Sequence, residues 1–111
     1  MKTFAIPVEN GQLCTHFGHC QQFAIIQVDD NKALQPDYLT PPPHEPGLLP
    51  KWLGQHGVTN VIAGGIGQQA INLFNKQNIQ VTIGAQIKTP DELVEEWLAD
   101  SLISGENACD H

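Results

Sequence analysis

The chain has 111 residues, of which 41% are hydrophobic, so it is long enough and apolar enough to fold as one domain around one core. Its 12 acidic and 5 basic side chains give a formal net charge of −7 at pH 7, and its lysines are scattered along a sequence without arginine. Nucleic-acid binding is therefore disfavoured, and the absence of a long apolar run and of a secretory signal predicts a cytoplasmic protein without a membrane span.

The first part of the chain predicts three antiparallel strands in a meander. Apolar residues alternate at positions 4, 6 and 8, as in a strand with one buried face, and residues 9–11 supply turn chemistry. Residues 12–15 predict a short second strand, and residues 23–28, which are rich in β-branched side chains, predict the third. Six prolines between residues 36 and 50 then predict a stiff loop, extended at the surface over residues 40–47.

The second part predicts alternating helices and strands. Apolar spacing predicts a helix over residues 49–56, a buried strand over 58–63, a helix containing residues 70–74 and a parallel strand over 79–84. Thr89, Pro90 and Glu92 are typical of a helix start and predict a last helix. These elements indicate an α/β fold with a mixed five-stranded sheet of order 3-2-1-4-5 and about three helices. We expect residues 1–100 to form the domain and 101–111 to form a C-terminal tail.

A cluster of potential metal ligands lies early in the chain. Cysteine and histidine together number eight, yet four of them fall between residues 14 and 20: Cys14, His16, His19 and Cys20. Thiolate and imidazole are soft or borderline ligands, and Gly18 would let the chain turn back so that they face one cavity. Metal ligation is our preferred interpretation. The alternative is that both cysteines are buried hydrophobic side chains and one histidine only bonds the turn.

Two further segments are candidates for the same site. We interpret Cys109 and His111, near the C-terminus, as additional metal ligands. The alternative is that they belong to a frayed tail. Gly64, Gly65 and Gly67 join a predicted buried strand to a helix start, where backbone amides and the helix dipole favour an anion. The alternative for each glycine is a tight turn that needs glycine for close packing.

The order of these motifs resembles the dinitrogenase iron-molybdenum cofactor biosynthesis family over essentially the whole chain. The matching segments are the strand at residues 4–8, the sequence His-Phe-Gly-His-Cys at 16–20, the strand from residue 23, the glycine turn at 64–70, Gly-Ala at 84–85 and Cys-Asp-His at 109–111. This resemblance implies a ribonuclease-H-like α/β fold and a small protein that binds, carries or stores metal clusters. It also implies that His16, His19 and Cys20 belong to the cluster-facing loop, with the glycine turn at the rim of the cavity.

We therefore predict a non-enzymatic carrier or scaffold for an iron-sulfur or molybdenum-containing cluster, which would receive the cluster from a donor protein and deliver it to an acceptor protein. A second hypothesis is a thiol enzyme in which His16 or His19 activates Cys20 as the nucleophile. A third is a module without metal whose acidic surface and proline-rich loop, residues 41–46, dock a partner protein.

Overall fold

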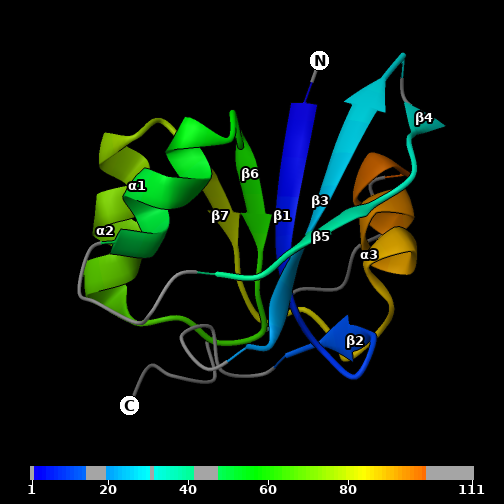
Figure 1. Ribbon diagram of the computed structural model, residues 1–111, viewed down its shortest axis with the longest axis horizontal. Coiled ribbons are helices and arrows are strands. Elements are labelled where there is room, and N and C mark those ends of the chain that lie inside the picture. The colour runs from blue at the N-terminus through cyan, green and yellow to red at the C-terminus, as the bar shows by residue number, and fades with distance from the viewer. Residues whose placement is uncertain (1, 15–19, 31, 42–47, 100–111) are drawn as a thin grey trace.

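One mixed sheet carries helices on both of its faces (Figure 1). The computed structural model describes residues 2–14, 20–30, 32–41 and 48–99. Within them the strands are β1 (Lys2–Glu9), β2 (Gln12–Leu13), β3 (Gln22–Asp29), β4 (Lys32–Ala33), β5 (Asp37–Leu39), β6 (Asn60–Ile62) and β7 (Gln80–Thr82). The helices in the same residues are α1 (Leu48–Gln55), α2 (Gln68–Lys76) and α3 (Pro90–Leu98). The predicted α/β class, mixed sheet and three helices are confirmed.

The number and order of the strands differ from the prediction. The described sheet has seven strands in the path β4-β3-β1-β6-β7, with β2 pairing with β1 and β5 pairing with β3. We expected residues 12–15 to separate the first and third strands, but β3 pairs directly with β1 from Lys2↔Val28 to Val8↔Gln22. An eight-residue strand can satisfy nearly all of one edge of β1, whereas β2 follows a tight turn and reaches only Val8 and Glu9.

The sequence interpretation also missed β4 and β5. β5 lies inside the segment that we expected to be a proline-rich loop, and its Leu39 pairs with Phe23 of β3. Pro36 immediately precedes this strand, so it removes no amide from the ladder. β4 is only two residues long and follows the turn after β3, too short for a period-2 pattern to be visible. The ribonuclease-H-like label remains a prediction of the resemblance.

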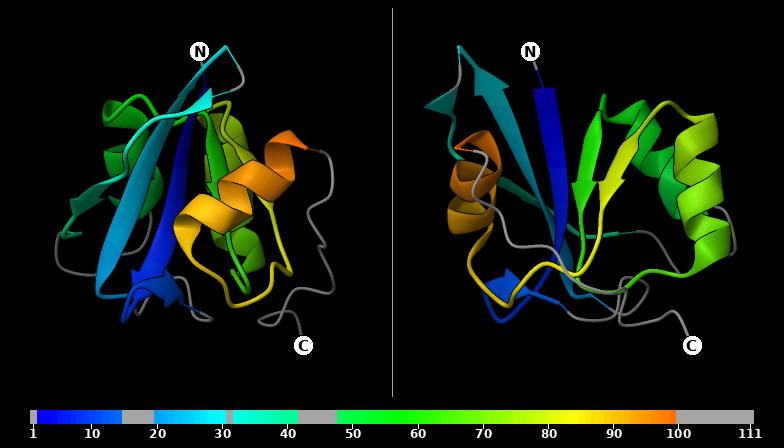
Figure 2. Two further views of the ribbon diagram at one scale, coloured as in Figure 1. Left: turned by 90° about the vertical axis from the view of Figure 1, so that its right-hand side faces the viewer. Right: turned by 180° about the vertical axis from the view of Figure 1, so that it is seen from behind.

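Two apolar clusters fix the layers of the fold. β1 has six consecutive buried residues because helices cover both faces of the sheet at its centre. Its Phe4 and Ile6 pack in the cluster that contains Leu93 of α3, whereas Ala5 packs in the cluster that contains Phe74 of α2. Figure 2 shows α3 alone on one face and the α1–α2 pair on the other.

Parallel strands β1, β6 and β7 end at the same edge of the sheet, which is the lower edge in Figure 2. The segments that follow β6 and β7 are joined there by backbone hydrogen bonds, from Gly84 N to Gly64 O at 3.1 Å and from Ala85 N to Ala63 O at 3.2 Å. In open α/β sheets the carboxyl ends of the strands are the usual position of a ligand site. In the described part of the chain, no helix is long and apolar enough to cross a membrane.

Candidate metal-binding site

Cys14 lies directly after β2, at the carboxyl end of β1. Its amide donates to the carbonyl oxygen of Pro7 at 2.8 Å, and its side chain is buried. The thiol Sγ lies 3.9 Å from Oε2 of Glu9, to which it donates. Alternation along β1 explains this contact. Val8 and its partner Leu13 point into the cluster beneath α3. The residues that follow them, Glu9 and Cys14, therefore point toward the opposite face of the sheet.

Cys20 enters the same corner from the other edge of β1. It precedes Gln21, whose amide donates to the carbonyl oxygen of Val8 at 3.1 Å. Cys20 is half-buried and packs against the apolar cluster that contains Phe23 and Ile66. Because this cluster lies between the sheet and the α1–α2 pair, Cys20 and Cys14 lie on the same side of the sheet.

The surroundings of Cys20 oppose its ionisation. The pKa of the Cys20 thiol is raised from 9.0 to about 12, chiefly by burial and to a smaller extent by negative charge on Cys14 and Glu9, while a backbone hydrogen bond acts to lower it. The thiol of the metal-free protein is therefore protonated at neutral pH. A metal ion that binds Cys20 must displace a proton, so metal binding in this corner should strengthen as the pH rises.

The glycine turn lies at the same edge of the sheet and leads into α2. Gly64 and Gly65 are buried, whereas Gly67 is exposed and is the N-cap of α2. Among the residues that the structure describes, a Cβ atom added at Gly67 would meet no atom within 4 Å, and the φ of −67° at this glycine is open to any residue. Close packing against the described residues therefore does not explain this glycine. With no acidic residue in its first turn, α2 presents its positive end at the rim.

The structure tests only part of the predicted ligand set. It brings Cys14 and Cys20 to one corner, whereas His16, His19, Cys109 and His111 lie outside the described residues. Among the residues that are described, no three Cys, His, Asp or Glu side chains are grouped so that they could hold a metal ion. Sequence reasoning placed Glu9 only in a turn. The alternation from Val8 to Glu9 was the available signal that this carboxylate shares a face with Cys14.

Comparison with known proteins places the amino-acid sequence in a family. The family model described as dinitrogenase iron-molybdenum cofactor matches residues 1–100. The chain belongs to this family. The predicted resemblance is thereby confirmed over residues 1–100, a range that does not include the Cys-Asp-His segment at 109–111.

Individual relatives agree with the fold. An uncharacterized protein of Methanocaldococcus jannaschii is 28% identical over an alignment of 103 residues, and the match covers 88% of this chain and 86% of that protein. The crystal structure of PH0822 matches with a TM-score of 0.85 and 26% identity, covering 92% of this chain and 93% of that one. The apo form of the orange protein from Desulfovibrio gigas matches with a TM-score of 0.77 and 19% identity, covering 96% and 95% of the two chains, which shows a shared fold.

Proposed function

We propose that this protein is a non-catalytic carrier or scaffold for a metal cluster. The observation that carries the proposal is the position of Cys14 and Cys20 at the carboxyl edge of the sheet in a member of this family. Cysteine thiolates are soft ligands that suit iron-sulfur clusters, and the carboxylate of Glu9 lies beside the Cys14 thiol. The cargo is an iron-sulfur or molybdenum-containing cluster, which the protein receives from a donor and passes to an acceptor.

The two thiols supply only part of the ligand set. In the proposal, Cys14 and Cys20 bind metal as thiolates, and His16, His19, Cys109 and His111 supply the remaining ligands. Amides of Gly64, Gly65 and Gly67, together with the positive end of α2, face the anionic sulfide or oxo groups of such a cluster. The corner thus combines donors for metal ions with a polar rim for anions.

Reconstitution tests the proposal. The protein is purified anaerobically, incubated with iron, sulfide and molybdate, and analysed for bound metal and visible absorption. We expect stoichiometric metal with charge-transfer bands in the native chain and loss of both in the double variant Cys14→Ser with Cys20→Ser. Val58→Ala, a buried change before β6, controls for lost stability because it leaves the corner intact. Wild-type metal content in the double variant would overturn the assignment of these ligands.

The hypothesis of a thiol enzyme receives less support from the structure. A nucleophilic cysteine reacts as the thiolate, so catalytic sites lower its pKa. The pKa of Cys20 is raised instead, chiefly by burial. The two histidines that would activate it lie outside the described residues. Slow, unselective alkylation of the metal-free protein would reject this hypothesis.

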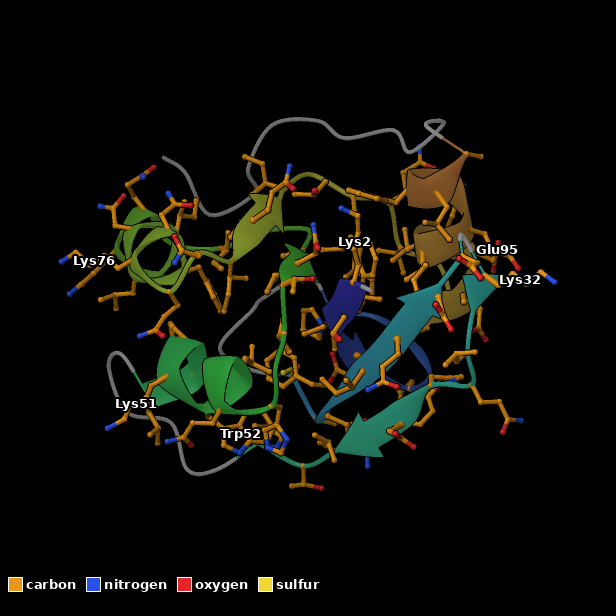
Figure 3. All side chains as sticks on the ribbon, turned by 90° about the horizontal axis from the view of Figure 1, so that it is seen from above. Lys2, Lys32, Lys51, Trp52, Lys76 and Glu95 are labelled. Carbon is orange, nitrogen blue, oxygen red and sulfur yellow. The ribbon has the colours of Figure 1, made fainter. Side chains whose placement is uncertain are left out.

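Partner docking remains compatible with the carrier proposal, since cargo transfer needs contact with other proteins. Figure 3 shows Lys51 and Lys76 on the side of α1 and α2, and Glu95 on the opposite side, on α3. The sequence from residue 48 to residue 90 contains no Asp or Glu, whereas α3 contains four. An acceptor with a basic surface would therefore approach from the α3 side. Deletion of residues 41–46 tests whether the proline-rich loop takes part.

A further inference from the structure

β7 is the outermost strand at one edge of the sheet, and in the described part of the chain no further strand pairs with it (Figure 1). Its inner side bonds toward β6, since Gln80 N donates to Thr59 O at 3.0 Å and Thr82 O accepts from Ala63 N at 2.8 Å. Successive residues of a strand direct their backbone groups to opposite sides, so Val81 directs both its N–H and its C=O away from the sheet. Among the described residues, no backbone group bonds to either.

The residues on either side of Val81 extend this open edge. Ile79 and Ile83 lie two positions away and therefore direct their backbone groups to the same side. Ile79 N already donates to Phe74 O at 3.0 Å, but Ile79 O and Ile83 N bond to no backbone group in the part of the chain that the structure describes. Val81 and Ile83 are only half-buried, so the edge is partly accessible to solvent. It thus presents two donors and two acceptors along residues 79–83.

The two edges of the sheet differ in their protection. Proteins commonly protect an outer strand with proline or charged side chains, because open backbone groups pair with other chains. The opposite edge has Pro36 directly before β5, Asp37 within β5 and Lys32 in β4. Residues 77–87, which contain β7, have no proline and no charged side chain. The edge at β7 therefore lacks the usual protection against pairing.

We propose that β7 pairs with β7 of a second copy of this chain, antiparallel and about a two-fold axis through Val81. In this register each Val81 N–H donates to the Val81 C=O of the other copy, and each Ile83 N–H donates to the Ile79 C=O of the other copy. A two-fold interface needs a self-complementary surface, and the donors and acceptors of this edge supply one. The two sheets then continue as one sheet across the axis.

The charge distribution permits this pairing although each chain carries a formal net charge of −7. Residues 48–90 contain no Asp or Glu, and four acidic side chains lie on α3, which packs against β1, β3 and β4. Like charges therefore do not face each other directly across the paired strands. Since so short a strand buries little surface, the association is weak and depends on concentration. The inference uses neither cysteine, so it is separate from the proposed metal binding.

Proline at position 81 tests the proposal, because it removes an N–H that the sheet itself does not use. Native chain, Val81→Pro and the matched variant Val81→Ala are compared with reductant present, by sedimentation equilibrium at concentrations up to about 1 mM. Val81→Ala loses side-chain contacts with the apolar cluster but keeps the N–H. Circular dichroism and chemical denaturation establish whether each variant is folded.

We expect the native chain and Val81→Ala to approach the mass of a dimer as concentration rises, without larger species. Val81→Pro should associate at least about tenfold more weakly, because both central hydrogen bonds are lost. A native chain that stays monomeric or grows beyond a dimer would overturn the proposal, as would a folded Val81→Pro that associates as well as Val81→Ala.

Hydrogen exchange on the unaltered chain gives a second test that does not depend on a variant's folding. The amides of Val81 and Ile83 should exchange more slowly as the protein concentration rises, because pairing protects them, whereas the amide of Gly67 should not change. Exchange at Val81 and Ile83 that is independent of concentration would overturn the proposal. Metal content enters neither test, so the cluster proposal stands or fails separately.

Discussion

The two ends of the parallel strands use their polar groups in opposite ways. At the amino end, Thr59 Oγ1 accepts from Thr3 N at 3.0 Å and donates to Asn60 Oδ1 at 2.7 Å, and Asn60 Nδ2 donates to Gln80 Oε1 at 3.2 Å. These contacts join β1, β6 and β7 and satisfy the buried Asn60. Polar groups here bond to one another and hold the sheet together.

At the carboxyl end the polar groups serve a different purpose. Cys14, Cys20 and the carboxylate of Glu9 lie at this end of the sheet, as does the glycine turn that leads into α2, and these are the groups to which we assign metal binding in the proposed function. The amino ends of the parallel strands are therefore joined by side-chain hydrogen bonds, whereas the carboxyl ends carry two cysteine thiols. Changes at the amino end should alter stability, and changes at the carboxyl end should alter reactivity and binding.

The largest expected effect concerns the reactivity of Cys20. Its pKa of about 12, against 9.0 for an ordinary thiol, keeps it protonated, so iodoacetamide should alkylate it about a hundred to a thousand times more slowly at pH 7.5 than in the urea-unfolded chain. The rate should keep rising above pH 10. Because the folded pKa is raised above the unfolded value, this group's contribution to stability is complete below pH 9 and is lost as the pH rises toward 12.

Site-resolved mass spectrometry of metal-free protein measures this rate. Glu9→Gln removes one of the charges that raise the pKa, so it should accelerate alkylation at pH 7.5. Native Cys20 that reacts as fast as in urea would show that the corner does not suppress the thiolate.

At the opposite end, Asn60→Leu should destabilise the fold by about 1–3 kcal/mol. The buried amide loses its bonds to Thr59 and Gln80, and the partner groups must find water or remain unpaired. Chemical denaturation gives the free energy of unfolding. As a control, Gln80→Leu removes the same Asn60–Gln80 hydrogen bond through its exposed partner and should reduce the free energy of unfolding by less. Metal uptake should stay normal in both variants. An unchanged free energy in Asn60→Leu would contradict a structural role for this network.

Two glycines at the carboxyl edge separate folding from binding. Gly84 has a φ of +72°, so Gly84→Ala should cost about 1–2 kcal/mol through backbone strain. Gly67→Ala has open space around its Cβ and should cost only about 0.5 kcal/mol, from the weaker capping of α2. The methyl group would nevertheless lie at the rim, where it should weaken cluster uptake. Denaturation and reconstitution of the pair distinguish the two effects, and full cluster uptake by Gly67→Ala would exclude this rim position.

The smallest effect should come from the ion pair between Lys88 and Glu96. Nζ and Oε2 are 2.7 Å apart, but both side chains are partly exposed, so Lys88→Met should cost only about 0.2–1 kcal/mol. High salt should reduce the difference between variant and native chain, since screening weakens the native pair. A larger decrease in the free energy of unfolding that does not depend on salt would mean that Lys88 supports the nearby Leu13 segment by packing rather than by charge.

Local signals in the sequence were sufficient for the second half of the fold and for part of the site. The predicted N-cap Thr89 accepts from the Glu92 amide at 3.3 Å, and α2, β6 and β7 lie where spacing predicted them. Helix caps and apolar periodicity act over a few residues, so one sequence contains them completely. The concentration of cysteine and histidine between residues 14 and 20 was likewise visible in the sequence.

Only the tertiary structure decided which strand lies beside β1 and which groups meet at its end. β2 pairs with β1 as predicted, but β3 pairs with the other edge of β1 and not with β2, and β5 depends on an edge that β3 first creates. Such contacts are set by competition between distant segments for the same hydrogen bonds and buried surface, which no local pattern encodes.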